Sequence, residues 1–171
     1  MIEDLKKLQL TIASNNKEKI ADIFQFPLSD TAYSIYIDDS TYYEQFEANG
    51  NKTTKAMFLQ FFKKISASIL IDQLNNLFQN IKVDSLLHKD TLQYDAYIES
   101  EPCFYSYEID AHKNIVRLTM NMNSNSNYKS SKKLSEDDIP ENSSEYCEHD
   151  FWWLFKFDGK QLYLENISGA D

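Results

Sequence analysis

The chain has 171 residues, of which 42% are hydrophobic and 14% aromatic, and its formal net charge is −10 at neutral pH. This composition excludes a disordered chain and predicts one packed domain over residues 1–171. The acidic balance argues against nonspecific binding to nucleic acid or to anionic membranes, because both need an excess of Lys and Arg. A basic partner is allowed, and the simpler explanation is that the charge keeps the protein in solution.

Targeting and redox features are few in this sequence. No stretch approaches the roughly 18 apolar residues of a membrane span, and residues 1–13 lack the apolar segment of a signal peptide. The expected location is therefore the cytoplasm. Cys103 and Cys147 lie far apart without metal-ligand spacing, so neither a disulfide framework nor a zinc site is predicted.

The first part of the chain has helical periodicity. Residues 1–13 place Ile2, Leu5, Leu8 and Ile12 on one stripe, which predicts an amphipathic helix. Capping residues at 14–16 predict a second short helix over 17–24, which ends before Pro27. Residues 33–37 alternate like a short strand.

The longest predicted helix follows the Asn49-Gly50 turn, with Thr53 or Thr54 as its cap. Apolar residues recur at intervals of three and four from Met57 to Ile81, with a bend expected near residues 71–72. Such a stripe indicates a core face rather than a cofactor site.

From residue 91 the period changes to two, which indicates strands. Strands are predicted over 92–98, 103–109 and 115–122, with a turn at 111–113. Helices followed by a meander of antiparallel strands indicate an α+β fold.

The last strands form a predicted hairpin over residues 149–167. Two aromatic-rich runs flank Asp158-Gly159, which predicts a type I′ turn. Trp152 and Trp153 are adjacent and therefore point to opposite faces of a strand. A strand that is apolar on both faces is expected in the middle of a covered sheet.

Residues from about 123 to 149 have no periodicity and are rich in acidic side chains. A connection of this length in a compact domain is functional or flexible. We expect a long, flexible acidic loop here.

Three stretches carry a resemblance to a known family: residues 16–28, the predicted helix around 57–65, and the closing run 153–162. Together with the element order, they resemble the nuclear transport factor 2-like superfamily, whose cone-shaped α+β fold is shared with ketosteroid isomerases and polyketide cyclases. The resemblance implies N-terminal helices packed on a curved, mostly antiparallel sheet that encloses a conical pocket. Members use this pocket for catalysis, ligand binding, dimerisation or inhibition of another protein, so the fold alone does not give the function.

Catalytic members of that superfamily place an Asp with a His or Tyr in the pocket. The pocket candidates in this chain are Tyr94, Asp95, Tyr97, Tyr105 and Tyr107. His88 and His112 fall in predicted loops, and no acid/base dyad emerges. No cofactor motif is present, and the carboxylate runs lack the spacing of a metal site.

The acidic loop provides the candidate partner-binding residues: Glu136, Asp137, Asp138, Glu141, Glu145, Tyr146 and Glu148. Acidic side chains with an interleaved Tyr are suited to a basic protein, because charge steers association and Tyr adds packing area. The sequence therefore favours a non-enzymatic protein-binding domain, most concretely a bacterial immunity protein that inhibits a cognate basic toxin. The alternatives are a small-molecule-binding or isomerase/dehydratase-like pocket protein, and a homodimeric module with an apolar open sheet face.

Overall fold

The computed structural model describes residues 2–96, 101–125 and 147–170 and confirms an α+β architecture. Its main sheet has five strands in the order β3-β4-β5-β6-β7, and every neighbouring pair is antiparallel. The strands are β3 (Thr91–Ala96), β4 (Cys103–His112), β5 (Ile115–Ser124), β6 (Glu148–Phe157) and β7 (Leu162–Ala170). The predicted meander is therefore correct, whereas the conical pocket of the resemblance stays a prediction.

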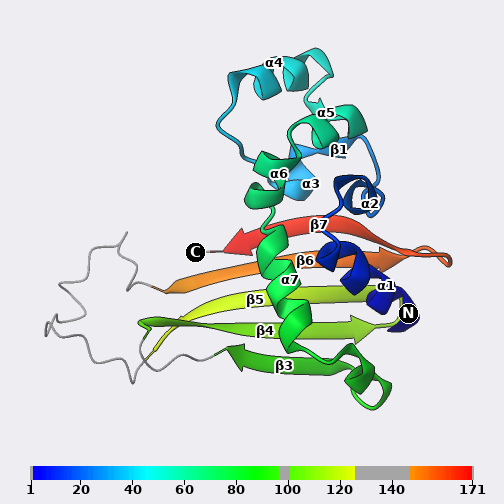
Figure 1. Ribbon diagram of the computed structural model, residues 1–171, viewed down its shortest axis with the longest axis vertical. Helices are drawn as coiled ribbons and strands as arrows, with labels where there is room; N and C mark the ends of the chain where they lie inside the picture. Colours follow the sequence, from blue (N-terminus) through cyan, green and yellow to red (C-terminus); the bar gives the residue numbers. More distant parts are fainter. Residues whose placement is uncertain (1, 97–100, 126–146, 171) are drawn as a thin grey trace, which may run out of the picture.

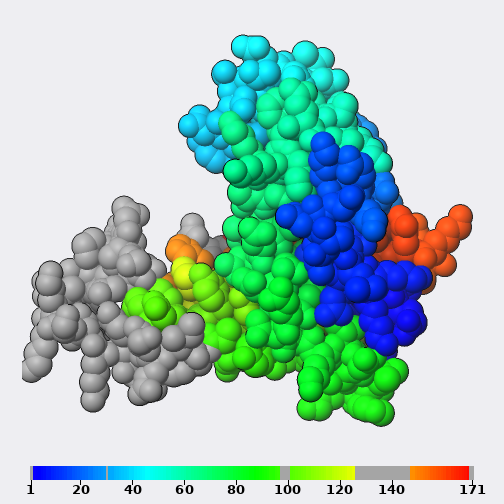
Figure 2. Space-filling model, viewed as in Figure 1, coloured from blue at the N-terminus to red at the C-terminus, as the bar shows by residue number. Residues whose placement is uncertain are grey.

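The helices precede the sheet in the chain. They are α1 (Ile2–Ala13), α2 (Lys17–Ala21), α3 (Asp30–Tyr33), α4 (Ser40–Ala48), α5 (Lys55–Gln60), α6 (Phe62–Ser68), α7 (Ile71–Asn80) and the 3₁₀ helix η1 (Val83–Leu87). Two short strands, β1 (Leu28–Ser29) and β2 (Lys52–Thr53), pair with each other. Helices α1 and α7 lie across one face of the main sheet, and α4 and α5 extend beyond its β7 edge (Figure 1). Figure 2 shows α1 and α7 from the outside of that helical layer.

The core lies between this helical layer and the sheet. Alternate strand residues such as Ile109, Leu118 and Trp153 point toward the helices and are fully buried. Leu74 and Leu77 of α7 meet them and are also fully buried. The spacing in the sequence thus predicted the correct core face of α1, α7 and β5.

The predicted long helix is broken into α5, α6 and α7. The second break lies at Leu70, whose φ of 54° is left-handed and cannot continue a helix. It falls just before the bend expected at residues 71–72. At this break the carbonyl of Ile69 accepts a hydrogen bond from Nε1 of Trp153, at 2.9 Å. A partner 84 residues away thus satisfies the open helix end.

Two local predictions are wrong. Residues 33–37 do not form a strand, because α3 ends at Tyr33, Ser34 has a φ of 45°, and residues 34–37 are irregular. The turn between β6 and β7 is not type I′, because Gly159 has a positive φ and Asp158 does not. Instead, the Asp158 carboxylate accepts hydrogen bonds from the backbone N–H groups of Lys160 and Gln161.

The hairpin itself is correct, but β6 is not the middle strand. It lies between β5 and the edge strand β7. Trp153 is fully buried against the helices, while Trp152 is half-buried on the opposite face. Only the helix-side face of β6 is covered among the described residues. The expectation that both faces are covered is therefore wrong, because Trp152 on the other face does not belong to the core cluster.

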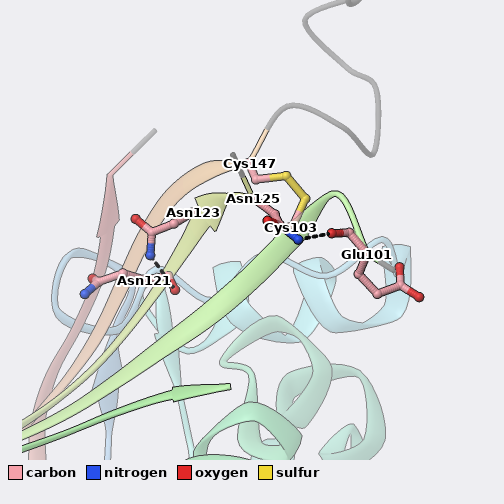
Figure 3. The surroundings of a disulfide bond; sticks show 6 residues. All are labelled: Glu101, Cys103, Asn121, Asn123, Asn125 and Cys147. Atoms are coloured by element: carbon pink, nitrogen blue, oxygen red, sulfur yellow. Dashed lines mark hydrogen bonds between the residues drawn. A yellow bond between two sulfur atoms is a disulfide. The ribbon is translucent and has the colours of Figure 1, made fainter. Parts of the chain in front are cut away.

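Cys103 and Cys147 form a disulfide, which corrects the expectation of none. The register aligns Cys103 with Ser124 and Glu148 with Asn123, so the ends of β4 and β6 flank the end of β5. The buried Asn125 adds a second tie, because its Nδ2 donates to the carbonyl of Glu101 at 2.8 Å (Figure 3). The strand register, which the sequence did not reveal, brings the two sulfurs together.

Candidate protein-binding surface

The sheet face opposite α1 and α7, called the outer face below, has no helical cover within the described ranges. Its apolar side chains lie outside the core cluster and outside the partly buried residues packed on it; they are Phe104, Ile115, Trp152, Leu154 and Tyr163. Strand alternation places polar residues between them. The outer face therefore presents aromatic and charged groups together.

Trp152 lies near the centre of the outer face. The register places Thr119 of β5 on one side of it and Ser168 of β7 on the other. Glu108 follows beyond Thr119 in the same row. The small neighbours leave the indole ring half-buried rather than fully buried, so Trp152 can pack against another molecule.

Three carboxylates form what we call the acidic patch: Asp95 on β3, Glu108 on β4 and Asp150 on β6. Asp95 and Asp150 are three strand spacings apart, which corresponds to about 14 Å. Within the described part of the chain, none of the three has an ion-pair partner. The Asp95 carboxylate accepts a hydrogen bond from Oγ of Ser106 at 2.7 Å, which holds it at the sheet surface.

Arg117 and Lys156, two cations on the described part of the outer face, are already paired. Arg117 lies 3.6 Å from Asp110, and Lys156 lies 3.2 Å from Glu165. The hydrogen bond that Lys156 donates to the Glu165 carboxylate raises the pKa of Lys156. Because these cations are compensated locally, the acidic patch gives its end of the outer face a negative potential.

The pocket candidates divide between the two faces of the sheet. Tyr94, Tyr105 and Tyr107 share the helix-side face, since they are in register with one another and with core residues. Asp95 belongs to the outer face. Tyr107 is buried and its hydroxyl donates to Oε1 of Gln73 at 3.1 Å, and burial raises its pKa.

The sheet thus separates Asp95 from the tyrosines, and they do not form an acid/base pair. Tyr97 lies outside the described residues.

Of the predicted partner-binding residues, the structure describes Glu148, which is exposed at the start of β6 opposite Asn123. The others lie outside the described residues; they are Glu136, Asp137, Asp138, Glu141, Glu145 and Tyr146. Sequence reasoning missed Glu108, Asp150 and Trp152 as one surface. The alternation in β4 and β6 could have assigned each of these residues to a face of its own strand. Only the register between the strands shows that they lie on the same face of the sheet.

A groove of about 740 Å³ lies between α1, α7 and η1. It contains His88, but its Lys6 and Asp84 are paired with each other at 2.6 Å. No group of three or more metal-ligating side chains is found in the parts of the chain that the structure describes.

None of the described helices is both long and apolar enough to cross a membrane. Comparison with protein-family models, with curated proteins and with solved structures found no match. The nuclear transport factor 2-like resemblance therefore stays a prediction.

Proposed function

We propose that this chain is a non-enzymatic protein-binding domain that binds a basic protein through the outer face of its sheet. The observation that carries the proposal is the acidic patch of Asp95, Glu108 and Asp150 beside the half-buried Trp152. Negative potential steers a basic protein toward this end of the sheet. Trp152 then supplies packing area at the centre of the contact.

Most concretely, the chain is an immunity protein that inhibits a cognate basic toxin of bacterial origin. The net charge of −10 supports this proposal, because fast electrostatic capture suits an inhibitor that must act before its target does. The predicted loop residues from Glu136 to Glu148 belong to the same proposal as a second acidic contact. Binding alone blocks the toxin, so neither cofactor nor metal is needed.

A homodimer through the outer face is less well supported. A stable self-associating face has an apolar centre, whereas this one contains charged residues in its middle rows, such as Glu108 and Arg117. Two copies would also bring together a charge of −10 each. These properties favour a partner of opposite charge.

The test begins with affinity capture of a basic protein from an extract of the source cells, followed by its purification. Association is then measured by stopped flow at several salt concentrations with the triple variant Asp95→Asn, Glu108→Gln, Asp150→Asn. We expect the association rate constant at low salt to fall by about tenfold or more, with a weaker salt dependence.

The matched control neutralises three exposed carboxylates on the helices: Glu44→Gln, Glu47→Gln, Asp72→Asn. It changes the net charge by the same amount. A larger effect of the first triple would therefore come from the position of its three carboxylates and not from the net charge. Equal association rates for both triples would exclude the outer face as the binding site. Neutralising Glu136, Asp137, Asp138 and Glu141 together tests the loop in the same assay.

The cytoplasmic location stays a prediction, and the Cys103–Cys147 disulfide counts against it. Cytoplasmic thiols are kept reduced, whereas oxidising compartments retain disulfides. Maleimide labelling of the protein in freshly lysed source cells distinguishes the two cases. Two reactive thiols would indicate a reducing compartment.

A further inference from the structure

The two edges of the main sheet differ in the hydrogen bonds that they make with the rest of the chain. At the β7 edge, the backbone N–H of Leu164 donates to the carbonyl of Ile23 at 2.7 Å. The carbonyl of Leu164 accepts from the hydroxyl of Tyr33 at 2.8 Å. The segment before β1 and helix α3 thus cover this edge, as proteins do to prevent unwanted strand pairing.

The β3 edge has no such cover among the residues that the structure describes. One contact shows which backbone groups of β3 bond to β4: the N–H of Ala111 donates to the carbonyl of Asp90 at 2.8 Å. Bonded and non-bonded pairs alternate along an antiparallel ladder. The backbone groups of Leu92, Tyr94 and Ala96 therefore face β4, and those of Thr91, Gln93 and Asp95 point to the open edge.

The side chains on the two faces of β3 determine which kind of strand can pair with this edge. On the helix side, Leu92 is half-buried and Tyr94 is 42% exposed, so apolar surface is available there. On the outer side, Asp95 is exposed and Glu108 lies on the neighbouring strand. An added strand therefore meets apolar side chains on one face and, on the other, the Asp95 carboxylate, with Glu108 one strand further away.

We infer that β3 accepts an extended, basic segment of the partner protein as a sixth strand of the sheet. The segment alternates apolar residues, which pack on Leu92 and Tyr94, with Lys or Arg, which face Asp95. This inference rests on the proposed function for the charge of the partner but not for the strand pairing. A second copy of the chain fits less well, because it repeats the charge of −10.

The direct test uses three ten-residue peptides that alternate valine with lysine, threonine or glutamate. Amide hydrogen exchange of the full chain is followed by NMR with and without each peptide. We expect the amides of Thr91, Gln93 and Asp95 to exchange rapidly in the free protein and to be protected by the lysine peptide. Protection should follow the order lysine, threonine, glutamate.

Gln93 offers a matched pair of variants. Gln93→Pro removes an outward N–H without removing a bond to β4, which edge strands tolerate. Gln93→Ala removes the side chain and keeps the N–H. We expect Gln93→Pro to weaken the lysine peptide about tenfold, and Gln93→Ala to change its affinity much less. Circular dichroism checks that both variants fold.

Several results would overturn the inference. These are slow exchange of the three amides in the free protein, peptide binding without their protection, or equal weakening by Gln93→Pro and Gln93→Ala. A lysine peptide that protects no better than the threonine peptide would overturn the basic character of the segment. The triple-variant assay measures the charge of the outer face, including Asp95, whereas amide protection and the Gln93 pair of variants measure backbone pairing at β3, so the proposed function and the strand pairing can fail separately. A change in sedimentation to a dimer without peptide would assign the edge to a second copy and contradict the inference.

Discussion

Trp152 and Trp153 are neighbours in the chain, yet their rings lie on opposite faces of β6 and have different roles. Trp153 is fully buried, and its ring packs edge-on against that of Phe151 with the ring centroids 4.9 Å apart. Its Nε1–H donates to the backbone carbonyl of Ile69. Trp152 makes no core contact. One residue therefore holds the sheet to the helical layer, and the other is available for binding.

The two tryptophans should separate stability from binding. Trp153→Ala should lower the free energy of unfolding by about 3–5 kcal/mol, because it leaves a cavity and an unbonded carbonyl at Ile69. Trp152→Ala should lower it by about 1 kcal/mol or less and should weaken binding of the captured basic protein. Urea denaturation and isothermal titration calorimetry measure the two effects. Equal destabilisation by both variants would contradict the assignment of faces.

At the scale of elements, an ion pair connects α4 to α6. Asp39 is the N-cap of α4, where its carboxylate accepts from the N–H of Tyr42 at 3.2 Å. The same carboxylate accepts from Nζ of Lys64 on α6 at 2.7 Å. The Lys64 hydrogen bond, followed by that from Tyr42, lowers the pKa of Asp39 below its ordinary value.

This lowered pKa predicts a specific pH dependence of stability. A carboxyl whose pKa is lower in the folded state stabilises the fold above its unfolded pKa of about 3.9, and this contribution is lost as pH falls through the folded pKa. Asp39→Asn keeps a capping oxygen and removes the charge. The variant should therefore be less stable than the wild type at pH 6, and the difference should vanish at strongly acidic pH.

Urea denaturation between pH 2.5 and 7 measures this difference. Asp38→Asn is the matched control, because Asp38 is exposed and its side chain makes no ion pair among the described residues. A stability difference for Asp39→Asn that stays constant over the whole range would show that its charge is not involved.

For the whole molecule, the disulfide is the longest-range covalent constraint. It joins residues 44 positions apart, with their Cα atoms separated by 5.6 Å. Closing a loop of this length in the unfolded chain is expected to stabilise the fold by about 4 kcal/mol in the chain-entropy model.

Removing the disulfide should therefore weaken the whole domain. The double variant Cys103→Ser, Cys147→Ser should unfold at a lower urea concentration than the oxidised wild type, and reduced wild type should behave like the variant. Fluorescence of the two tryptophans follows the transition. Identical midpoints with and without reductant would mean that the cross-link contributes nothing to folding.

The sequence by itself determined the core faces of α1 and β5 and the order of the strands in the main sheet. Periods of 3.6 and 2 depend only on neighbouring residues, so the stripe in α1 and the alternation in β4 and β5 could be identified without a structure. The hairpin of β6 and β7 was found for the same reason, through its turn residues. The tyrosines of β3 and β4 could be named as candidates, but not assigned to a common side opposite Asp95.

Only the tertiary structure decided the break at Leu70, the Cys103–Cys147 disulfide, the acidic patch and the open edge of β3. Each depends on groups far apart in the chain. Trp153 donates a hydrogen bond to Ile69, and the two cysteines meet across the end of β5. Ile23 pairs with the β7 edge and leaves the β3 edge uncovered among the described residues. Local periodicity contains no information about such pairings. Strand register and helix packing fix them, because one shift of register would move every side chain of a strand to the other face.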